Sequence, residues 1–429
     1  MSEVAPLNII ILGGGIAGLT TALALTKFAP ASRPPPQITL YEIRPEPATI
    51  GGAVNLTPNA LRLLSHLGAL QEIRANHYGK ECGAVEVFDL YTGSKLSESS
   101  FRGPDGNGLG NPPFAALRIT RGESLKGVLA AIDKHSNIKL ICGMKTTGIK
   151  EDANGVRLTF VSGETVTADI LIGCDGIHSV TRLKHVEPER KSVYSGICNA
   201  FGFAPRRKTP SGEYEDTHFE TSAMNFGRRG MLLTSFHDEK QDSIYVGALM
   251  QIPEIESRDG WKARGADAEK TRQDILERYS SANNPLVNHL IEDVQDLFLW
   301  PVFTLSKDGK WATERVMLIG DSAHAMPPQG ESTGIVFEDG VLFARCLGRW
   351  MEKDDGSPVK QAFDAYERLR RGRIEVAWDE SQSVVKTVND AGWLGHKIKL
   401  MIVPWYLWWT RGYREAHFIE DVTTSDLKY

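Results

Sequence analysis

Three glycines near the start of the chain have the spacing of a dinucleotide-binding turn. Gly13-x-Gly15-x-x-Gly18 follows the apolar run Leu7 to Leu12 and precedes a segment with helical spacing. In such a turn the first glycine permits a tight bend, the second lets backbone approach a pyrophosphate, and the third lets helix and strand pack closely. Glu42 ends the next apolar run and can accept hydrogen bonds from ribose hydroxyls. These residues predict a site for an adenosine diphosphate group; a glycine turn without a ligand is the alternative.

An aspartate follows another buried run much later in the chain. The segment RVMLIGD ends at Asp321, and a carboxylate at the carboxyl edge of a parallel sheet faces the ligand crevice, where it can hold a hydroxyl group. The loop Pro327-Pro328-x-Gly330 is stiff and can lie against a flat ring. Gly334 begins a helix whose positive end favours negative charge on a ligand. An aspartate that only caps a helix is the alternative.

The elements that must position these residues form a βαβ unit. Leu7 to Leu12 predicts a buried parallel strand, Ile16 to Phe28 a helix, and Gln37 to Tyr41 a second strand. The segment from Tyr194 to Leu305 alternates apolar and polar residues, as an antiparallel sheet covered on one face would. We therefore expect an α/β protein, α+β overall, with a Rossmann-like nucleotide-binding domain, an antiparallel-sheet substrate domain and a C-terminal helical segment.

The chain returns to the first domain after the substrate segment, because the RVMLIGD strand belongs with the N-terminal strands. The expected domains are residues 1–185 with 306–375, residues 186–305, and residues 376–429. Residues Ala362 to Val376 are rich in arginine and predict a helix with a solvated charged face.

Composition excludes several classes of protein. The formal net charge of -5 over 429 residues is spread without long runs of one sign, so nucleic acid is not an expected partner. The five cysteines lack zinc or disulfide spacing, which predicts reduced thiols and no metal. Met1 to Pro6 does not begin a secretory signal, so we expect an intracellular, cytoplasmic protein.

One aromatic stretch near the end of the chain raises the question of membrane contact. Leu400 to Trp409 reads LMIVPWYLWW, which is too short to span a bilayer. We expect it to pack on the body or on a second subunit of a homodimer. Attachment to a membrane surface is the alternative, because Lys397, Lys399 and Arg411 flank the aromatic residues.

Two further motifs carry a resemblance to a known family. Asp175-Gly176-x-x-Ser179 with Arg182 stands in DILIGCDGIHSVTR, and Gly320-Asp321 stands in RVMLIGDSAHAMPPQGESTG. With the N-terminal glycines, these motifs resemble in order and spacing the FAD-dependent aromatic hydroxylases of the para-hydroxybenzoate and salicylate hydroxylase type. The resemblance covers most of residues 7–375 and is weak in the substrate segment.

The resemblance implies FAD as the cofactor and assigns further residues to it. Asp175 and Arg182 would help to hold the flavin and the nicotinamide donor; a buried structural ion pair between them is the alternative. Arg121 matches an arginine that contacts the flavin chain, although alone it is a helix-start arginine. Ala53 matches a small residue that lets backbone approach FAD.

The resemblance also implies the chemistry. Because the chain has only one G-x-G-x-x-G, NAD(P)H would bind transiently at the surface and reduce FAD. O₂ would add at flavin C4a, and the hydroperoxide would hydroxylate or epoxidise an aromatic or polycyclic small molecule, in secondary metabolism. A double-bond reductase of the same fold and a non-catalytic flavin-fold binding protein are the alternatives, and the chain could be a monomer or a homodimer.

The substrate segment departs from the family pattern. Many relatives carry an Arg-Gly pair and a tyrosine where this chain has Phe201 and Phe236. His237 and Tyr245 are the nearest titratable residues that could bind or activate a substrate hydroxyl, with a structural role as the alternative for each. The catalytic residues are therefore not assigned by the sequence.

Overall fold

A parallel sheet forms the centre of the first body. The computed structural model describes residues 5–49, 51–280, 285–328, 330, 332–353 and 355–427. The sheet has the strand order β18-β12-β1-β2-β8 and every pair is parallel. Its strands are β1 (Asn8–Leu12), β2 (Gln37–Tyr41), β8 (Ile138–Ile141), β12 (Ile170–Gly173) and β18 (Val316–Leu318). Apolar, β-branched residues fill these strands because helices and a smaller sheet cover them.

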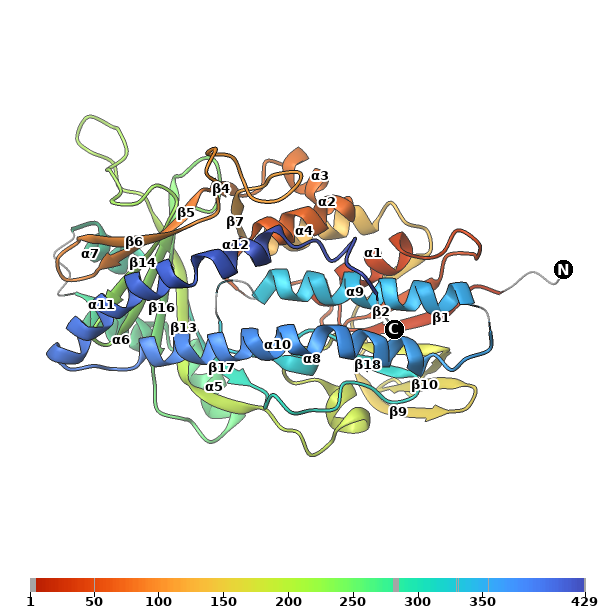
Figure 1. Ribbon diagram of the computed structural model, residues 1–429. Helices are drawn as coiled ribbons and strands as arrows, with labels where there is room; N and C mark the ends of the chain where they lie inside the picture. The colour runs from red at the N-terminus through yellow and green to blue at the C-terminus, as the bar shows by residue number, and fades with distance from the viewer. Residues whose placement is uncertain are drawn as a thin grey trace.

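Helices and two small sheets surround the parallel sheet. Helix α1 packs on α9 and α4, and α9 packs on α2 and α10. The helices are α1 (Ile16–Lys27), α2 (Pro58–His66), α3 (Ala69–Ala75), α4 (Arg121–Ile132), α8 (Asp321–His324) and α9 (Ser332–Lys353), with a short π-helix at Arg182–Val186. The small sheets are β3 (Ala53–Leu56), β7 (Ala116–Thr120) and β4 (Lys80–Cys82), and β9 (Thr146–Asp152), β10 (Gly155–Phe160) and β11 (Thr165–Ala168). Figure 1 shows this body at the end of the molecule that carries the N-terminus.

A seven-stranded sheet forms the second body, at the opposite end in Figure 1. Its order is β17-β13-β16-β15-β14-β5-β6, and every pair except β14 with β5 is antiparallel. The strands are β5 (Ala84–Asp89), β6 (Lys95–Ser100), β13 (Val193–Pro205), β14 (Ser222–Gly227), β15 (Gly230–Ser235), β16 (Ser243–Gln251) and β17 (Gln295–Thr304). Helices α5 (Arg258–Ala266), α6 (Ala268–Tyr279) and α7 (Pro285–Asp293) lie along one face.

The domain boundaries expected from the sequence differ from the strand pairing in two places. Strands β5 and β6 belong to the seven-stranded sheet, although the expected boundaries place them in the first domain. The parallel pairing of β5 with β14 joins residues far apart in sequence, and a local pattern does not reveal such pairing. The boundary expected at residue 375 falls inside one continuous helix, α10 (Lys360–Val388).

The C-terminal region spans both bodies. Figure 1 shows α10 running along the molecule from the first body to the second, where α11 (Trp393–Trp409) follows. Helix α12 (Arg411–Ile419) then leads the tail back to the first body. There the buried Arg62 donates hydrogen bonds to the carbonyls of Phe418, Ile419 and Glu420. Among the described residues, no helix is both long and apolar enough to cross a membrane.

The arginine-rich part of α10 is not simply a solvated face, so that prediction was wrong for one residue. Arg370 is 2% exposed and donates to Glu338 Oε2 at 2.8 Å and to Asp339 Oδ1 at 2.6 Å. Both carboxylates lie on α9 and are themselves buried. Arg370 sits on the same side of α10 as Tyr366 and Ile374, and this i, i+4 spacing places it in the buried stripe.

Removing the buried cation should leave two buried carboxylates without their arginine. We expect Arg370→Met to lower the free energy of unfolding by about 3–5 kcal/mol. The control is Lys134→Met, which removes an exposed ion pair with Glu72 and should cost less than about 1 kcal/mol. Urea unfolding of the holoprotein measures both, and equal losses for the two variants would contradict the expectation.

Candidate active site

The glycine turn is shaped by two close contacts and one open position. Gly13 has φ of +109°, and a Cβ there would lie 2.2 Å from the carbonyl oxygen of Cys174. A Cβ on Gly18 would lie 2.0 Å from the carbonyl oxygen of Gly13, so this glycine lets α1 approach β1. Gly15 has no atom within 4 Å of that position. Two glycines therefore serve the fold, and Gly15 leaves space for a ligand at the start of α1.

Glu42 stands at the same edge of the parallel sheet. Its side chain is buried and accepts hydrogen bonds from the backbone N–H of Gly14 at 2.7 Å and of Arg44 at 2.9 Å. Two amides thus fix the carboxylate beside the glycine turn. A carboxylate has about four acceptor sites, so ribose hydroxyls can still bind it.

Asp175 follows strand β12 and is held by its own loop. Its carboxylate accepts hydrogen bonds from Ser179 Oγ, from Thr181 N at 2.9 Å and from Thr181 Oγ1 at 3.1 Å. Burial raises the pKa of this carboxyl, and these hydrogen bonds oppose the rise. The loop that follows Asp175 is therefore rigid.

Arg182 does not pair with Asp175, which overturns the alternative of a buried ion pair between them. Its fully buried guanidinium donates to three backbone carbonyls, those of Ile177, Arg190 and Ser322. The bond to Ser322, at 2.9 Å, joins the loop after Asp175 to the residue next to Asp321. Arg182 thus fixes the loop after β12 relative to the loop after β18.

Asp321 and Arg121 are the charged groups without partners in this region. Asp321 is exposed at the start of α8 and Arg121 is exposed at the start of α4, and neither side chain makes a hydrogen bond or ion pair within the described part of the chain. The surrounding protein raises the pKa of Asp321, while the positive charges of His324 and Arg121 oppose the rise. A carboxyl group that is enclosed by protein yet reached by solvent is expected where a ligand binds.

The loop from Gly51 to Ala53 brings the two bodies together. A Cβ on Gly51 would lie 2.4 Å from Cδ of Arg121, and a Cβ on Gly52 would lie 2.0 Å from Cε2 of Tyr245. Ala53 belongs to a buried cluster with Phe201 and Tyr245. The glycines are therefore needed so that the loop fits between Arg121 of the first body and Tyr245 of the second.

Aromatic side chains of the seven-stranded sheet pack against one another beside this loop. Phe203 contacts Tyr245 with ring centroids 5.8 Å apart, and Phe201 stacks with Phe298 at 5.7 Å. His237 meets the edge of Phe203 at 4.8 Å. It is 8% exposed, and neither ring nitrogen has a hydrogen-bond partner. Burial lowers the pKa of His237, so its imidazole is neutral at neutral pH.

The structure separates the two phenylalanines singled out in the sequence. Phe201 lies in the cluster beside Ala53, whereas Phe236 packs with Phe219 on the other face of the sheet, under α5 to α7. The reason is that successive side chains along a strand point to opposite faces of the sheet, so the register decides which face each phenylalanine joins.

The sequence did not single out Arg118, which the structure brings to the same place. Arg118 lies on β7, is 7% exposed, and donates to Ser235 Oγ at 2.8 Å. Its guanidinium lies 5.1 Å from the ring centroid of Tyr245. A lone arginine within the apolar strand ALRIT was the available signal, because a charge in a buried strand needs a specific partner.

Gly334 lies in the first turn of α9, which begins at Ser332, and packs against Thr57 and Asn59. Asn59 also donates a hydrogen bond to Glu338, which is a partner of Arg370. The same buried network therefore holds the start of α9, where the helix dipole has its positive end.

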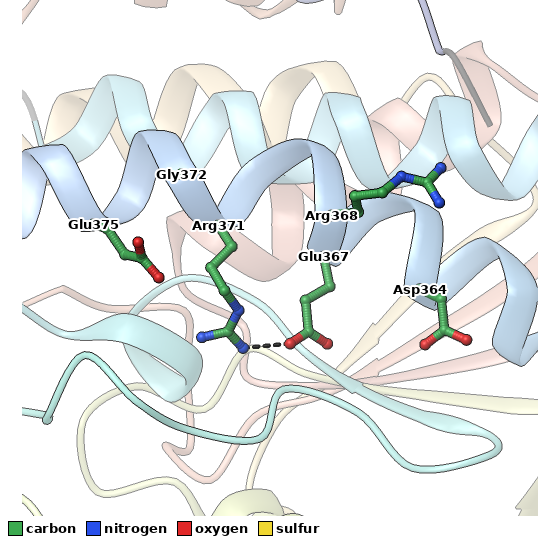
Figure 2. Close-up of a pocket in the computed structure, with 6 residues that line it drawn as sticks. All are labelled: Asp364, Glu367, Arg368, Arg371, Gly372 and Glu375. Atoms are coloured by element: carbon green, nitrogen blue, oxygen red, sulfur yellow. Dashed lines mark hydrogen bonds and ion pairs between the residues drawn. The ribbon is translucent and has the colours of Figure 1, made fainter.

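A surface hollow of about 410 Å³ lies elsewhere, on the outer side of α10 (Figure 2). Three acidic and two basic side chains line it, and Arg371 pairs with Glu367 four residues away. None of the candidate residues described above is among the side chains that line this hollow, so the candidate active site stays at the Gly51–Ala53 loop.

The arrangement is that of a dinucleotide-binding fold with a second sheet closing over its ligand edge. The glycine turn, Glu42, and the free Arg121 and Asp321 fit the adenosine, pyrophosphate and ribityl parts of FAD. The sequence matches the model of the FAD binding domain family over residues 7–380. The chain therefore belongs to this family.

Individual relatives agree with this result. The chain is 28% identical to 3-amino-4-hydroxybenzoate 2-monooxygenase PtmB3 of Streptomyces platensis, covering 86% of this chain and 85% of the relative. It is 26% identical to salicylate hydroxylase of Pseudomonas putida, covering 88% and 86%. Klebsiella pneumoniae HpxO complexed with FAD and uric acid superposes with a TM-score of 0.73 at 19% identity, covering 98% of each chain. These findings confirm the expected family, the fold, FAD as cofactor, and the class of FAD-dependent monooxygenase.

Two glycine substitutions should separate ligand binding from folding. Gly15→Ala adds a methyl group in open space, so we expect little change in stability but roughly tenfold or more weaker FAD binding. Gly18→Ala overlaps the Gly13 carbonyl, and we expect it to destabilise the protein by about 1–3 kcal/mol. FAD titration by flavin fluorescence and thermal unfolding of the apoprotein measure the two effects. Unchanged FAD affinity in Gly15→Ala would argue against a pyrophosphate at this turn.

Proposed function

We propose that the protein inserts one atom of O₂ into an aromatic or polycyclic small molecule, with NAD(P)H as the transient electron donor. The observation that carries this proposal is the contact of Tyr245 with Gly52, which sets a cluster of aromatic side chains, the aromatic wall, against the Gly51–Ala53 loop. Bound FAD would supply the hydride acceptor and the activation of O₂. Relatives named for 3-amino-4-hydroxybenzoate, salicylate and 6-hydroxynicotinate support an aromatic substrate.

The FAD-binding residues are part of the same proposal. Gly15 and the start of α1 would take the pyrophosphate, and Glu42 the adenosine ribose. Arg121 and Asp321 would hold the chain that leads to the flavin ring. The first turn of an α-helix has backbone N–H groups without intrahelical partners, and at the start of α9 these groups and the positive end of the helix dipole would favour negative charge on a reduced flavin.

The aromatic wall would position the substrate and exclude water. Phe201, Phe203 and Tyr245 offer flat apolar surfaces beside Ala53, and a planar ring can stack or pack edge-on against them. Burial raises the pKa of Tyr245, so its hydroxyl keeps its proton at neutral pH. Because these side chains keep water away from the flavin, water cannot react with the activated oxygen before the substrate does.

Arg118 and His237 would provide the polar contacts to the substrate. The buried positive charge of Arg118 favours a substrate oxygen that carries negative charge. The neutral imidazole of His237 can accept a proton from a substrate hydroxyl, which makes the adjoining ring more electron-rich. This pair takes the place of the Arg-Gly and tyrosine of many relatives.

The central test is a screen of aromatic and polycyclic compounds for stimulated NAD(P)H oxidation. A substrate should raise nicotinamide oxidation together with equal O₂ uptake, and oxygenated product should carry label from ¹⁸O₂. Without O₂, NAD(P)H should still reduce the bound FAD but yield no oxygenated product. A protein that holds no flavin, or that forms its product anaerobically, would refute the proposal.

Replacing His237 tests its role as a proton acceptor. We expect His237→Asn to lower kcat about 10–100-fold. In the wild type, kcat should fall with decreasing pH as His237 is protonated below its lowered pKa, that is, below pH 6.5. The variant should lose this acidic limb. His218→Asn is the matched control, because His218 is a half-buried histidine that bonds Asn225 on the other face of the sheet; equal effects of the two substitutions would exclude the proposed role.

A further inference from the structure

Helix α11 has two opposite apolar sides, and the protein covers only one of them. Leu400, Val403 and Leu407 pack against the seven-stranded sheet. The other side carries large apolar residues that expose about half or more of their surface: Leu394, Ile398, Met401, Trp405, Trp408 and Trp409. Met401 is 76% exposed and Trp408 is 72% exposed. A helix that is apolar all round normally lies in a fully apolar environment.

The uncovered side is larger than a monomer usually tolerates. These six residues expose roughly 800 Å² of side-chain surface, whereas the largest apolar patch of a typical monomer is roughly 300–600 Å². Their spacing of three and four residues makes them one continuous stripe. Trp405 and Trp409 stack in parallel with ring centroids 5.8 Å apart, so the stripe is preorganised. Figure 1 shows α11 at the end of the molecule formed by the seven-stranded sheet.

Charge around the stripe indicates what covers it. Residues 391–414 contain Lys397, Lys399, Arg411 and Arg414 and no acidic residue, in a chain whose net charge is -5. Lys399 is partly buried, and Arg411 pairs with Glu415, the residue that follows this stretch. Lys397 is exposed beside the stripe and makes no ion pair within the part of the chain that the structure describes. In a two-fold dimer through this stripe, the basic residues of the two copies would lie close together and repel. Anionic lipid headgroups provide the opposite charge.

We infer that the outer side of α11 docks on an anionic membrane surface, with the Trp-rich stripe inserted among the lipid headgroups and acyl chains. The helix would lie in the plane of the interface, because its tryptophans suit this depth and its lysines can reach the phosphates. The inner side of α11 packs on the body, as expected; for the outer side, a membrane surface is preferred over a second subunit.

Helix α11 and the aromatic wall of the candidate active site contact the same residue of the seven-stranded sheet. Leu233 of β15 packs both in the cluster under α11 and in the cluster of Ala53, Phe201 and Tyr245. One face of the sheet therefore bears both the membrane-facing helix and the aromatic wall. Apolar substrates concentrate in bilayers, so docking would place the enzyme where such compounds are abundant.

Vesicle flotation of the FAD-loaded protein tests the inference independently of any turnover. We expect the protein to float with phosphatidylcholine vesicles that contain about 30% phosphatidylserine, to float several-fold less with phosphatidylcholine alone, and to be released by salt. The double variant Trp405→Ser/Trp408→Ser should lose flotation. Lys397→Glu should weaken it roughly 30-fold, since the substitution changes the charge by two units and each charge near an anionic surface contributes about 1 kcal/mol.

The control is Val161→Ser, because Val161 is an exposed apolar residue that directly follows β10 of the first body. Figure 1 shows β10 and α11 at opposite ends of the molecule. The control variant should float like the wild type, and all variants should keep wild-type flavin absorbance and melting temperature. The inference is wrong if the wild type does not float with anionic vesicles, or if the double tryptophan variant still does. It is also wrong if sedimentation shows a dimer that the tryptophan substitutions dissociate while vesicles stay unbound.

Discussion

The start of helix α9 is held by a buried network of charges, and much of the structure depends on it. Arg370 of α10 bridges Glu338 and Asp339, while Asn59 of α2 donates to Glu338 at 2.7 Å. His324 of α8 bonds Asp339 at 2.8 Å, and the positive charges of His324 and Arg370 hold the pKa of that carboxyl below its usual value. Burying such charges is costly unless each is paired, so the four helices have one compatible arrangement. That arrangement fixes the position of the first turns of α9 relative to α2, α8 and α10.

The second constraint is the alternation of side chains along the seven-stranded sheet. Along β16, Ile244, Val246 and Ala248 pack under α5 to α7, whereas Tyr245 and Leu249 face the first body and α11. A shift of one residue would exchange the two sets, because successive side chains point to opposite faces. The same register therefore decides whether the aromatic wall meets the cofactor loop and whether α11 finds an apolar surface to pack on.

These two constraints explain where prediction from the sequence succeeded and where it failed. The glycine turn, the strand before Asp321 and the helix at Arg121 were predictable, because hydrophobic periodicity and turn residues act over a few residues. The pairing of β5 with β14 was not, because the two strands are more than 130 residues apart. The burial of Arg370 was missed for a similar reason: its partners Glu338 and Asp339 lie on another helix.

The sequence by itself determined the nucleotide-binding half, the cofactor and the family, because each motif consists of a strand, its turn or carboxylate, and the following helix within a short stretch of chain. Only the tertiary structure shows which residues come together at the proposed substrate side. Arg118, Tyr245 and His237 come from three strands or strand ends, and strand register decides whether they meet. The same register places Phe236 on the opposite face of the sheet. The tertiary structure also decided that one side of α11 stays uncovered. Composition gives the apolarity of a helix, but only packing shows how much of that surface remains open to a partner.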